Sequence, residues 1–298
     1  MAANRGARII LHSLERSRSQ RLLWLLEELN MSYEIKPYKR GLHERAPPEL
    51  KQFHPLGKAP ILEIQSPAKT DGAAATGDAA SGSSSSSIVL AESAVIMEHL
   101  LENFHHAPSS TSSSTQSQSQ NEQKSLVPPR WIAGQENQVN GETEAWRRYR
   151  YYMHYTEGSL MPLVVTNILM DVVQNAPPFF LKPFLGIIPG IVKKEYCGPN
   201  FATHLAFLEE QLATPTPSAE GSEETSSSDK PRYLAGTQFT AADILMSYPL
   251  IILQEVKVLD KEQYPVLSDY VTRIRELEGY RKAVRILEEI EGQEYRVL

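Results

Sequence analysis

Apolar residues in the first hundred positions follow two different spacings. Residues 9–11 form a short continuous apolar run, which is typical of a buried strand, whereas Leu22, Leu25, Leu26 and Leu29 recur at the spacing of one helix face. The order of such segments predicts an α/β arrangement in this part of the chain. Strands are expected over residues 8–12, 32–38, 60–64 and 88–90, and helices over 17–29 and 93–104.

The second half of the chain has almost exclusively helical periodicity. Thr240 and Asp243 form a T-x-x-D pattern in front of an apolar segment, which is typical of a capped helix start. The pattern predicts an all-α half after the α/β half. The expected helices cover residues 136–155, 158–175, 200–212, 241–256 and 264–289.

Three segments rich in Ser, with Gly, Ala, Gln or Thr, interrupt this pattern at residues 67–87, 106–130 and 214–231. They hold too few apolar residues to offset the entropy lost on ordering, so we interpret them as insertions and a linker. The predicted domains are residues 1–105, with the first insertion, and an all-helical domain of residues 131–298, with the third; residues 106–130 link them.

Charge and cysteine content narrow the function classes. The chain carries 30 Lys and Arg against 36 Asp and Glu, a net charge of −6, and it has no basic run, which disfavours nucleic acid as a partner. Its one cysteine, Cys197, excludes a disulfide framework and a Cys-rich metal site, so we expect no metal. No stretch approaches the roughly 20 apolar residues of a membrane span. We therefore expect a soluble, cytoplasmic protein.

Ser17 and Gln20 fit a capping box at the start of the first predicted helix. Capping alone would explain this pair. A hydroxyl at that place, beside free backbone N–H groups and the positive helix end, also suits an anion such as a thiolate.

Two further patterns place polar groups at strand ends. Pro60 opens an apolar strand directly after Lys58 and Ala59, where a cis-proline turn would leave the backbone of Ala59 free to pair with a ligand. Glu92 and Ser93 open a predicted helix directly after a strand. An edge-strand proline and a second helix cap would explain each pattern taken singly.

Taken together, the helix that follows Ser17, residues 58–60 and residues 92–93 resemble the cytosolic glutathione S-transferases, most closely the GTT-like branch of fungi and bacteria. The resemblance continues in residues 155–162 and in residues 239–244, which look like the family's capping motif. It implies a thioredoxin-like N-terminal domain followed by the C-terminal helical bundle of these transferases, assembled as a homodimer.

The same resemblance implies a role for individual residues. Ser17 would donate a hydrogen bond to the sulfur of glutathione and so favour the nucleophilic thiolate. Lys58 would pair with the glycyl carboxylate, and the main chain of Ala59, before Pro60, would pair with the cysteinyl backbone. Glu92 and Ser93 would hold the γ-glutamyl ammonium and carboxylate, and Tyr151, Tyr152, Tyr155 and Met161 would line the electrophile site.

The activity implied is conjugation of glutathione, a co-substrate, to small hydrophobic electrophiles, with peroxide reduction as a side activity. The alternative is a catalytically idle module of the same fold that serves regulation or protein interaction. The retained ligand-pairing residues favour the enzyme, and the Ser-rich segments favour the module.

Two alternatives stay open at this point. Ser19 competes with Ser17 as the thiolate partner, although Ser19 would lie inside the first helical turn. Residues 179–194 are apolar, interrupted by proline and end in Lys193 and Lys194. This segment either packs over the hydrophobic site or rests at a membrane surface.

Overall fold

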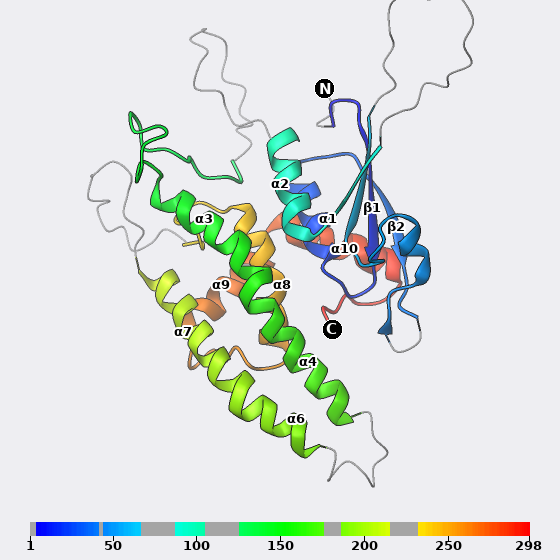
Figure 1. The fold of residues 1–298 in the computed structure, drawn as a ribbon, viewed down its shortest axis with the longest axis vertical. Coiled ribbons are helices and arrows are strands. Elements are labelled where there is room, and N and C mark those ends of the chain that lie inside the picture. Colours follow the sequence, from blue (N-terminus) through cyan, green and yellow to red (C-terminus); the bar gives the residue numbers. More distant parts are fainter. Residues whose placement is uncertain (1–3, 42–43, 67–86, 105–124, 176–185, 215–231) are drawn as a thin grey trace, which may run out of the picture. The chain divides into compact units, whose positions relative to one another are not determined.

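The computed structural model describes residues 4–41, 44–66, 87–104, 125–175, 186–214 and 232–298. The described residues divide into two compact units, one within residues 1–117 and 278–298 and the other within residues 118–277 (Figure 1). Each unit has its own buried apolar core.

The first unit is built on a four-stranded sheet with the order β2–β1–β3–β4. β1 (Arg8–Leu14) pairs in parallel with β2 (Glu34–Tyr38), and β3 (Ile61–Gln65) is antiparallel to both β1 and β4 (Ser87–Ala91). The four predicted strands, their order along the chain and the hairpin of β3 and β4 are confirmed.

Helices complete the first unit. α1 (Ser19–Glu28) follows β1 and contacts both β1 and α2 (Ser93–Phe104). A short 3₁₀ helix, η2 (Pro48–Gln52), precedes β3, and α10 (Glu278–Glu291) packs against α1. The parallel β1–α1–β2 segment joined to an antiparallel hairpin and a helix is the arrangement of a thioredoxin-like domain.

The second unit is helical. Its longest helix runs from α3 through a π-helical turn into α4 without a break, and residues 241–253 of α8 are all buried. Among the described residues, this one helix, Glu144–Gln174, has the length and apolar composition of a membrane span, a test that core helices of soluble proteins also meet. The elements are α3 (Glu144–Tyr155), α4 (Met161–Asn175), α6 (Ile187–Ile191), η4 (Val192–Cys197), α7 (Gly198–Ala213), α8 (Ala241–Glu255) and α9 (Pro265–Arg275).

The predicted helix over residues 136–155 begins too early. Asn137 and Asn140 have positive φ angles of 62° and 67°, which a right-handed helix does not accept. The helix starts at Glu144, after Thr143 caps it by accepting a hydrogen bond from the Trp146 amide.

The predicted helix over residues 264–289 is in fact two helices, α9 and α10, and they belong to different units. Tyr280 of α10 meets Trp24 of α1 edge to face, with ring centroids 5.2 Å apart, and Lys282 forms an ion pair with Glu27. The C-terminal helix therefore completes the first unit, so the predicted division at residue 131 is wrong for residues 278–298.

The predicted insertions lie mostly outside the described residues, but the predicted segments 67–87 and 106–130 each include residues that belong to a folded unit. Leu126 is 3% exposed and its carbonyl accepts a hydrogen bond from the Ala241 amide, so the second unit begins inside the predicted linker. Ser87 pairs with Gln65 as the first residue of β4.

Candidate active site

Two serine hydroxyls lie together at the turn between β1 and α1. The Oγ atoms of Ser17 and Ser19 are 2.9 Å apart, and Ser17 Oγ donates to the Leu14 carbonyl oxygen at 2.6 Å. The Ser19 amide donates to Ser17 Oγ at 3.2 Å. Ser17 is 7% exposed and Ser19 is 1% exposed, so Ser17 is the less buried of the two residues.

The predicted capping box of Ser17 and Gln20 is wrong. α1 begins at Ser19, so Arg18 occupies the N-cap position, where its side chain makes no capping hydrogen bond. Gln20 contributes only its main-chain N–H, which donates to the Ser17 carbonyl at 3.3 Å. Ser17 therefore sits outside the helix, and its hydroxyl belongs to the turn.

Lys58, Ala59 and Pro60 form the entry to β3. The Ala59–Pro60 bond is cis, which confirms the prediction. Lys58 is exposed, and among the described residues no hydrogen bond occupies either main-chain group of Ala59. Gly57 has a φ of +58°, and a Cβ there would meet Lys51 Cγ at 2.6 Å, so the stem of the Lys51 side chain lies against Gly57.

Glu92 and Ser93 stand where β4 passes into α2. Glu92 is exposed with a φ of +72°, and Ser93 is the first residue of α2 and is 4% exposed. Nη2 of the buried Arg21 donates to Ser93 Oγ at 3.0 Å. The Ser93 hydroxyl is thus held beside a guanidinium at the positive end of a helix, an environment that favours an anion.

The strand register brings these groups to one end of the sheet. Ile61, the first residue of β3, lies opposite Ala91 of β4 and opposite His12 of β1. Because antiparallel strands reverse direction, the start of β3 meets the ends of β1 and β4. The residues gathered there are Ser17, Lys58, Ala59, Pro60, Glu92 and Ser93.

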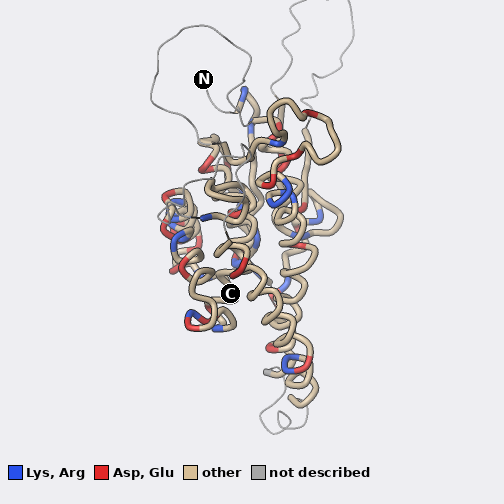
Figure 2. The backbone as a smooth tube through the Cα atoms, turned by 90° about the vertical axis from the view of Figure 1, so that its left-hand side faces the viewer, with Lys and Arg blue, Asp and Glu red and all other residues tan. Residues whose placement is uncertain are grey.

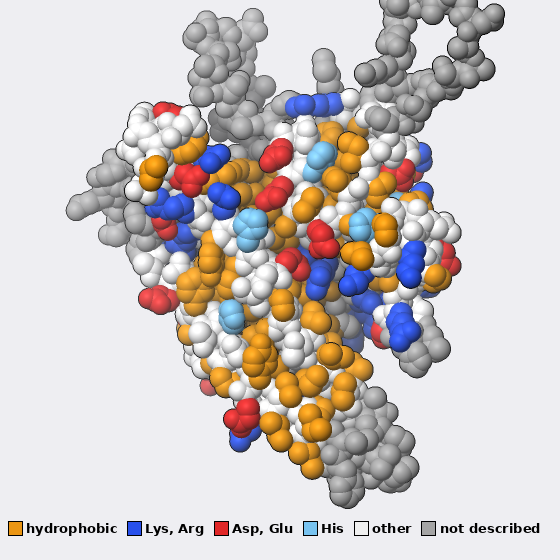
Figure 3. Space-filling model, in the orientation of Figure 1, with side chains coloured by type: hydrophobic (Ala, Val, Ile, Leu, Met, Phe, Trp, Pro, Cys, Tyr) orange, Lys and Arg blue, Asp and Glu red, His pale blue; other side chains and the backbone are white. Residues whose placement is uncertain are grey.

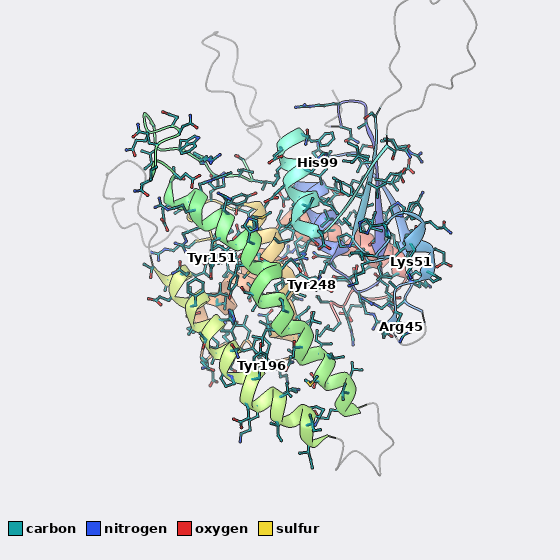
Figure 4. The ribbon with its side chains drawn as sticks, viewed as in Figure 1. Arg45, Lys51, His99, Tyr151, Tyr196 and Tyr248 are labelled. Atoms are coloured by element: carbon teal, nitrogen blue, oxygen red, sulfur yellow. The ribbon has the colours of Figure 1, made fainter. Side chains whose placement is uncertain are left out.

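The four side chains predicted for the electrophile site are placed unequally in the second unit. Tyr151 is 48% exposed, and its ring packs on Tyr155 and on Phe207 of α7 (Figure 4). Tyr152, Tyr155 and Met161 are 1%, 7% and 3% exposed, and burial raises the pKa of Tyr152 to about 12. Three of the four therefore help to form the core, and Tyr151 is the one that presents a broad surface.

The apolar segment predicted at residues 179–194 is described only from residue 186 onward. Figure 3 shows hydrophobic side chains gathered over the ends of α4 and α6. Both predictions for this segment, packing and a membrane surface, stay predictions. The exposed apolar side chains here include Leu169, Val172, Val173, Ile187, Ile188 and Ile191.

Comparison with known proteins decides the family. The sequence profile of the glutathione S-transferase N-terminal domain matches residues 17–103, and that of the C-terminal domain matches residues 202–278. Glutathione S-transferase 1 of Saccharomyces cerevisiae is 32% identical over 91% of this chain and 92% of its own. The chain belongs to the glutathione S-transferase family. Glutathione S-transferase 3 of Schizosaccharomyces pombe, at 27% identity over 94% of this chain and 88% of its own, supports a fungal type of transferase.

Solved glutathione S-transferase structures share the fold. A transferase from Actinobacillus pleuropneumoniae has a TM-score of 0.55 at 24% identity and covers 94% of this chain and 93% of its own. The transferase URE2P8 of Phanerochaete chrysosporium, solved with oxidized glutathione, has a TM-score of 0.59 at 14% identity, with 97% of each chain covered.

The matched residues include all six positions gathered at the end of the sheet, since these lie within residues 17–103. Within the described part of this transferase, no group of three or more His, Cys, Asp or Glu side chains could hold a metal ion. Lys and Arg are interspersed with Asp and Glu along the described chain, so no single-sign track runs over it (Figure 2).

Sequence reasoning missed Arg21 of this transferase. Its side chain is 0% exposed and contacts Ser93, a residue 72 positions away. A signal was present in the sequence, since Arg21 directly precedes the apolar run of residues 22–26 in the first predicted helix. The identity of its partner was not readable, because that depends on how α1 meets α2.

Proposed function

We propose that this transferase binds glutathione at the end of the sheet, forms its thiolate and transfers it to hydrophobic electrophiles. The observation that carries the proposal is the convergence of a serine hydroxyl, a free backbone segment at Ala59 and an acid–hydroxyl pair at the start of α2. Glutathione is an extended tripeptide with charges at both ends, and this set offers a complementary group for each part.

The γ-glutamyl end would meet Glu92 and Ser93. The exposed Glu92 carboxylate would attract the ammonium, while the Ser93 hydroxyl and the free N–H groups of α2 would take the carboxylate. Arg21 behind Ser93 adds positive charge to the same place. The backbone of Ala59 would pair with the cysteinyl residue, and Lys58 would face the glycyl carboxylate as a point charge.

The sulfur would then lie against Ser17. A hydrogen bond from the hydroxyl favours the charged form of the thiol, and the thiolate is the nucleophile. In the transfer, the thiolate forms a carbon–sulfur bond with the electrophile while the leaving group departs with its electron pair, and the thiol proton goes to water. Peroxide reduction would use the same thiolate.

Turnover of chlorodinitrobenzene with glutathione, beside calorimetric titration of glutathione alone, tests the proposal. We expect binding and turnover together. Binding without turnover of several electrophiles would favour the idle module, and absence of binding would contradict the site.

We further propose a homodimer in the cytoplasm. Light scattering should then give about twice the chain mass of 33.4 kDa, and a mass equal to one chain would contradict it. Flotation with vesicles tests whether the apolar residues at the ends of α4 and α6 hold the protein at a membrane surface.

A further inference from the structure

His12 is a buried ionisable side chain in β1 that the proposed chemistry does not use. It is 0% exposed. The strand register puts His12 on the same face of the sheet as Lys36 of β2 and Glu63 of β3, since Lys36 pairs with His12 and Glu63 pairs with Ile10. This face is the one away from Ile9 and Leu11, because side chains alternate along a strand.

The His12 ring is held from several sides. Its Nδ1 lies 2.9 Å from the Tyr38 hydroxyl oxygen, and its Nε2 lies 3.6 Å from a carboxylate oxygen of Glu63. The Phe53 ring packs on the His12 ring, with the two ring centroids 4.0 Å apart. The Lys36 Nζ lies over the Phe53 ring, 5.4 Å from its centroid. Contacts of this kind fix the position of Phe53 as much as that of His12.

Phe53 is the first residue after η2 and begins the loop that leads to Lys58 and Ala59. The amides of Phe53 and His54 both donate to the Leu50 carbonyl at 3.2 Å, and the Gly57 amide donates to the His54 carbonyl at 2.8 Å. The backbone is therefore tied from Phe53 to Gly57, directly before the proposed ligand-pairing residues. A displacement of the Phe53 ring would be carried along this chain of hydrogen bonds.

The charges around His12 determine what its protonation would do. Lys36 of β2 and Glu63 of β3 both face the His12 ring, and the Tyr38 hydroxyl contacts it. Burial and the negative charge of Glu49 in η2 raise the pKa of Tyr38. Burial first, and then Lys36, lower the pKa of His12 below its ordinary value of 6.5, while Glu63 opposes them. The ring is thus neutral at pH 7, and a proton added in acid creates a buried cation beside Lys36.

We propose that His12 is a positioning residue for glutathione, whose neutral ring fixes Phe53 and through it the backbone of residues 54–59. This inference rests on the proposed function of that loop. Two properties follow: the packing of the ring governs glutathione affinity, and the titration of the ring makes that affinity fall in acid.

The test measures the calorimetric Kd of glutathione and the split between KM for glutathione and kcat in three variants. We expect His12→Ala to raise Kd and KM on the order of tenfold with kcat nearly unchanged, because the loop but not the thiolate partner is displaced. His12→Phe retains the ring and should keep the Kd at neutral pH. Ile9→Ala, on the opposite face of β1, is the control that lowers Tm without contact with Phe53.

The pH dependence supplies an independent readout. Between pH 7.5 and 5.5 the Kd of the unsubstituted protein should rise, whereas that of His12→Phe should rise less, since no proton is added at this position. If His12→Ala does not fold, Phe53→Ala should produce the same rise in Kd, because Phe53 is only half-buried.

The outcomes separate the two proposals. If the unsubstituted protein does not bind glutathione, the proposed function fails and this inference fails with it. If it binds, and His12→Ala or Phe53→Ala changes Kd no more than Ile9→Ala does, the positioning role alone is overturned. An equal rise in acid for His12→Phe and the unsubstituted protein overturns the titration.

Discussion

The direction of one hydroxyl proton governs the chemistry proposed for this transferase. Ser17 Oγ donates to the Leu14 carbonyl, and Ser19 Oγ lies within 2.9 Å of it. Because a hydroxyl rotates to suit its partners, Ser19 can donate to Ser17 while Ser17 turns its own proton to a sulfur. Under the proposed function the two serines would have unequal roles: Ser17 would donate to the sulfur, and Ser19 would donate to Ser17.

Ser17→Ala should raise the pKa of bound glutathione and slow the transfer. A hydrogen bond to a charged group contributes about 1.5–3 kcal/mol, which corresponds to roughly one to two pKa units. Free thiols titrate near pH 8.5, so turnover near pH 7 should fall on the order of 10- to 100-fold. The pH–rate profile measures the pKa, and calorimetry should show a much smaller change in glutathione affinity.

Ser19→Ala is the matched variant. It should reduce turnover less than Ser17→Ala does, because it removes the hydrogen bond between the two hydroxyls and leaves the proposed thiolate partner, Ser17, in place. Loss of turnover in Ser19→Ala, with turnover retained in Ser17→Ala, would assign the sulfur to the other hydroxyl.

His12 also links stability to pH. Because its pKa in the folded protein is lowered from 6.5, the unfolded chain takes up this proton first as the pH falls. The contribution of the neutral His12 ring to the free energy of unfolding is therefore fully present above about pH 6.5, and it is lost as the pH falls towards the pKa of His12 in the folded protein. The free energy of unfolding in urea should thus drop more between about pH 7.5 and about pH 5.5 in the unsubstituted protein than in His12→Phe. Equal drops would contradict this.

At the level of one helix, the start of α8 depends on Asp243. Its 0%-exposed carboxylate accepts hydrogen bonds from the Thr240 amide and hydroxyl, the Leu234 amide and the Tyr270 hydroxyl, all at 2.8–2.9 Å. Burial raises the pKa of Asp243 although these four donors lower it. The predicted capping box is confirmed, and the carboxylate also joins α8 to α9 through Tyr270.

Asp243→Ala should therefore cost more than a helix cap alone, which contributes about 0.5–2 kcal/mol. Four buried donors would lose their acceptor at about 1–3 kcal/mol each before relaxation, so we expect a loss of at least about 3 kcal/mol in urea unfolding. Asp260→Ala, an exposed residue whose carboxylate accepts from two loop amides, is the control and should cost about 1 kcal/mol or less. Similar losses in both variants would show that the network around Asp243 contributes little.

Helix ends show why some elements could be predicted and others could not. The T-x-x-D pattern at Thr240 is local, so it located α8 correctly. The positive φ angles of Asn137 and Asn140 cannot be inferred from the spacing of apolar residues, so the predicted helix wrongly included both residues. Residues 276–277 separate α9 from α10 although the apolar positions continue on both sides.

At the scale of the whole molecule, the Ser-rich segments should be dispensable. Gln65 and Ser87 are paired at the base of the hairpin, so removal of residues 70–86 leaves the β3–β4 register intact. Removal of residues 109–124 stops short of Ser125 and the buried Leu126. Loop length enters closure entropy only logarithmically, so Tm and the Kd of glutathione should change little. Loss of soluble protein in both deletions would contradict this.

The sequence was sufficient for the order of the strands along the chain and for the β3–β4 hairpin, and its short motifs at strand and helix ends pointed to the six residues that the structure gathers at one end of the sheet. It was insufficient for Arg21 and His12. Their partners, Ser93 and Phe53, are set by how α1 meets α2 and by how the residue that follows η2 packs on β1, which no local pattern encodes. The same reason explains why Tyr152 and Met161, apolar enough for a ligand surface, are packed inside instead.

The return of α10 to the first unit has a consequence for biosynthesis. Residues 1–117 emerge from the ribosome early. The surface of α1 that contacts Tyr280 and Lys282 is covered only when the last part of the chain has been synthesised. The nascent first unit must therefore remain incomplete while about 160 residues of the helical unit are synthesised and emerge. The first unit is thus the first to be started and the last to be completed during synthesis. A chain truncated before residue 278 would lack α10, and the side of α1 that carries Trp24 would stay uncovered.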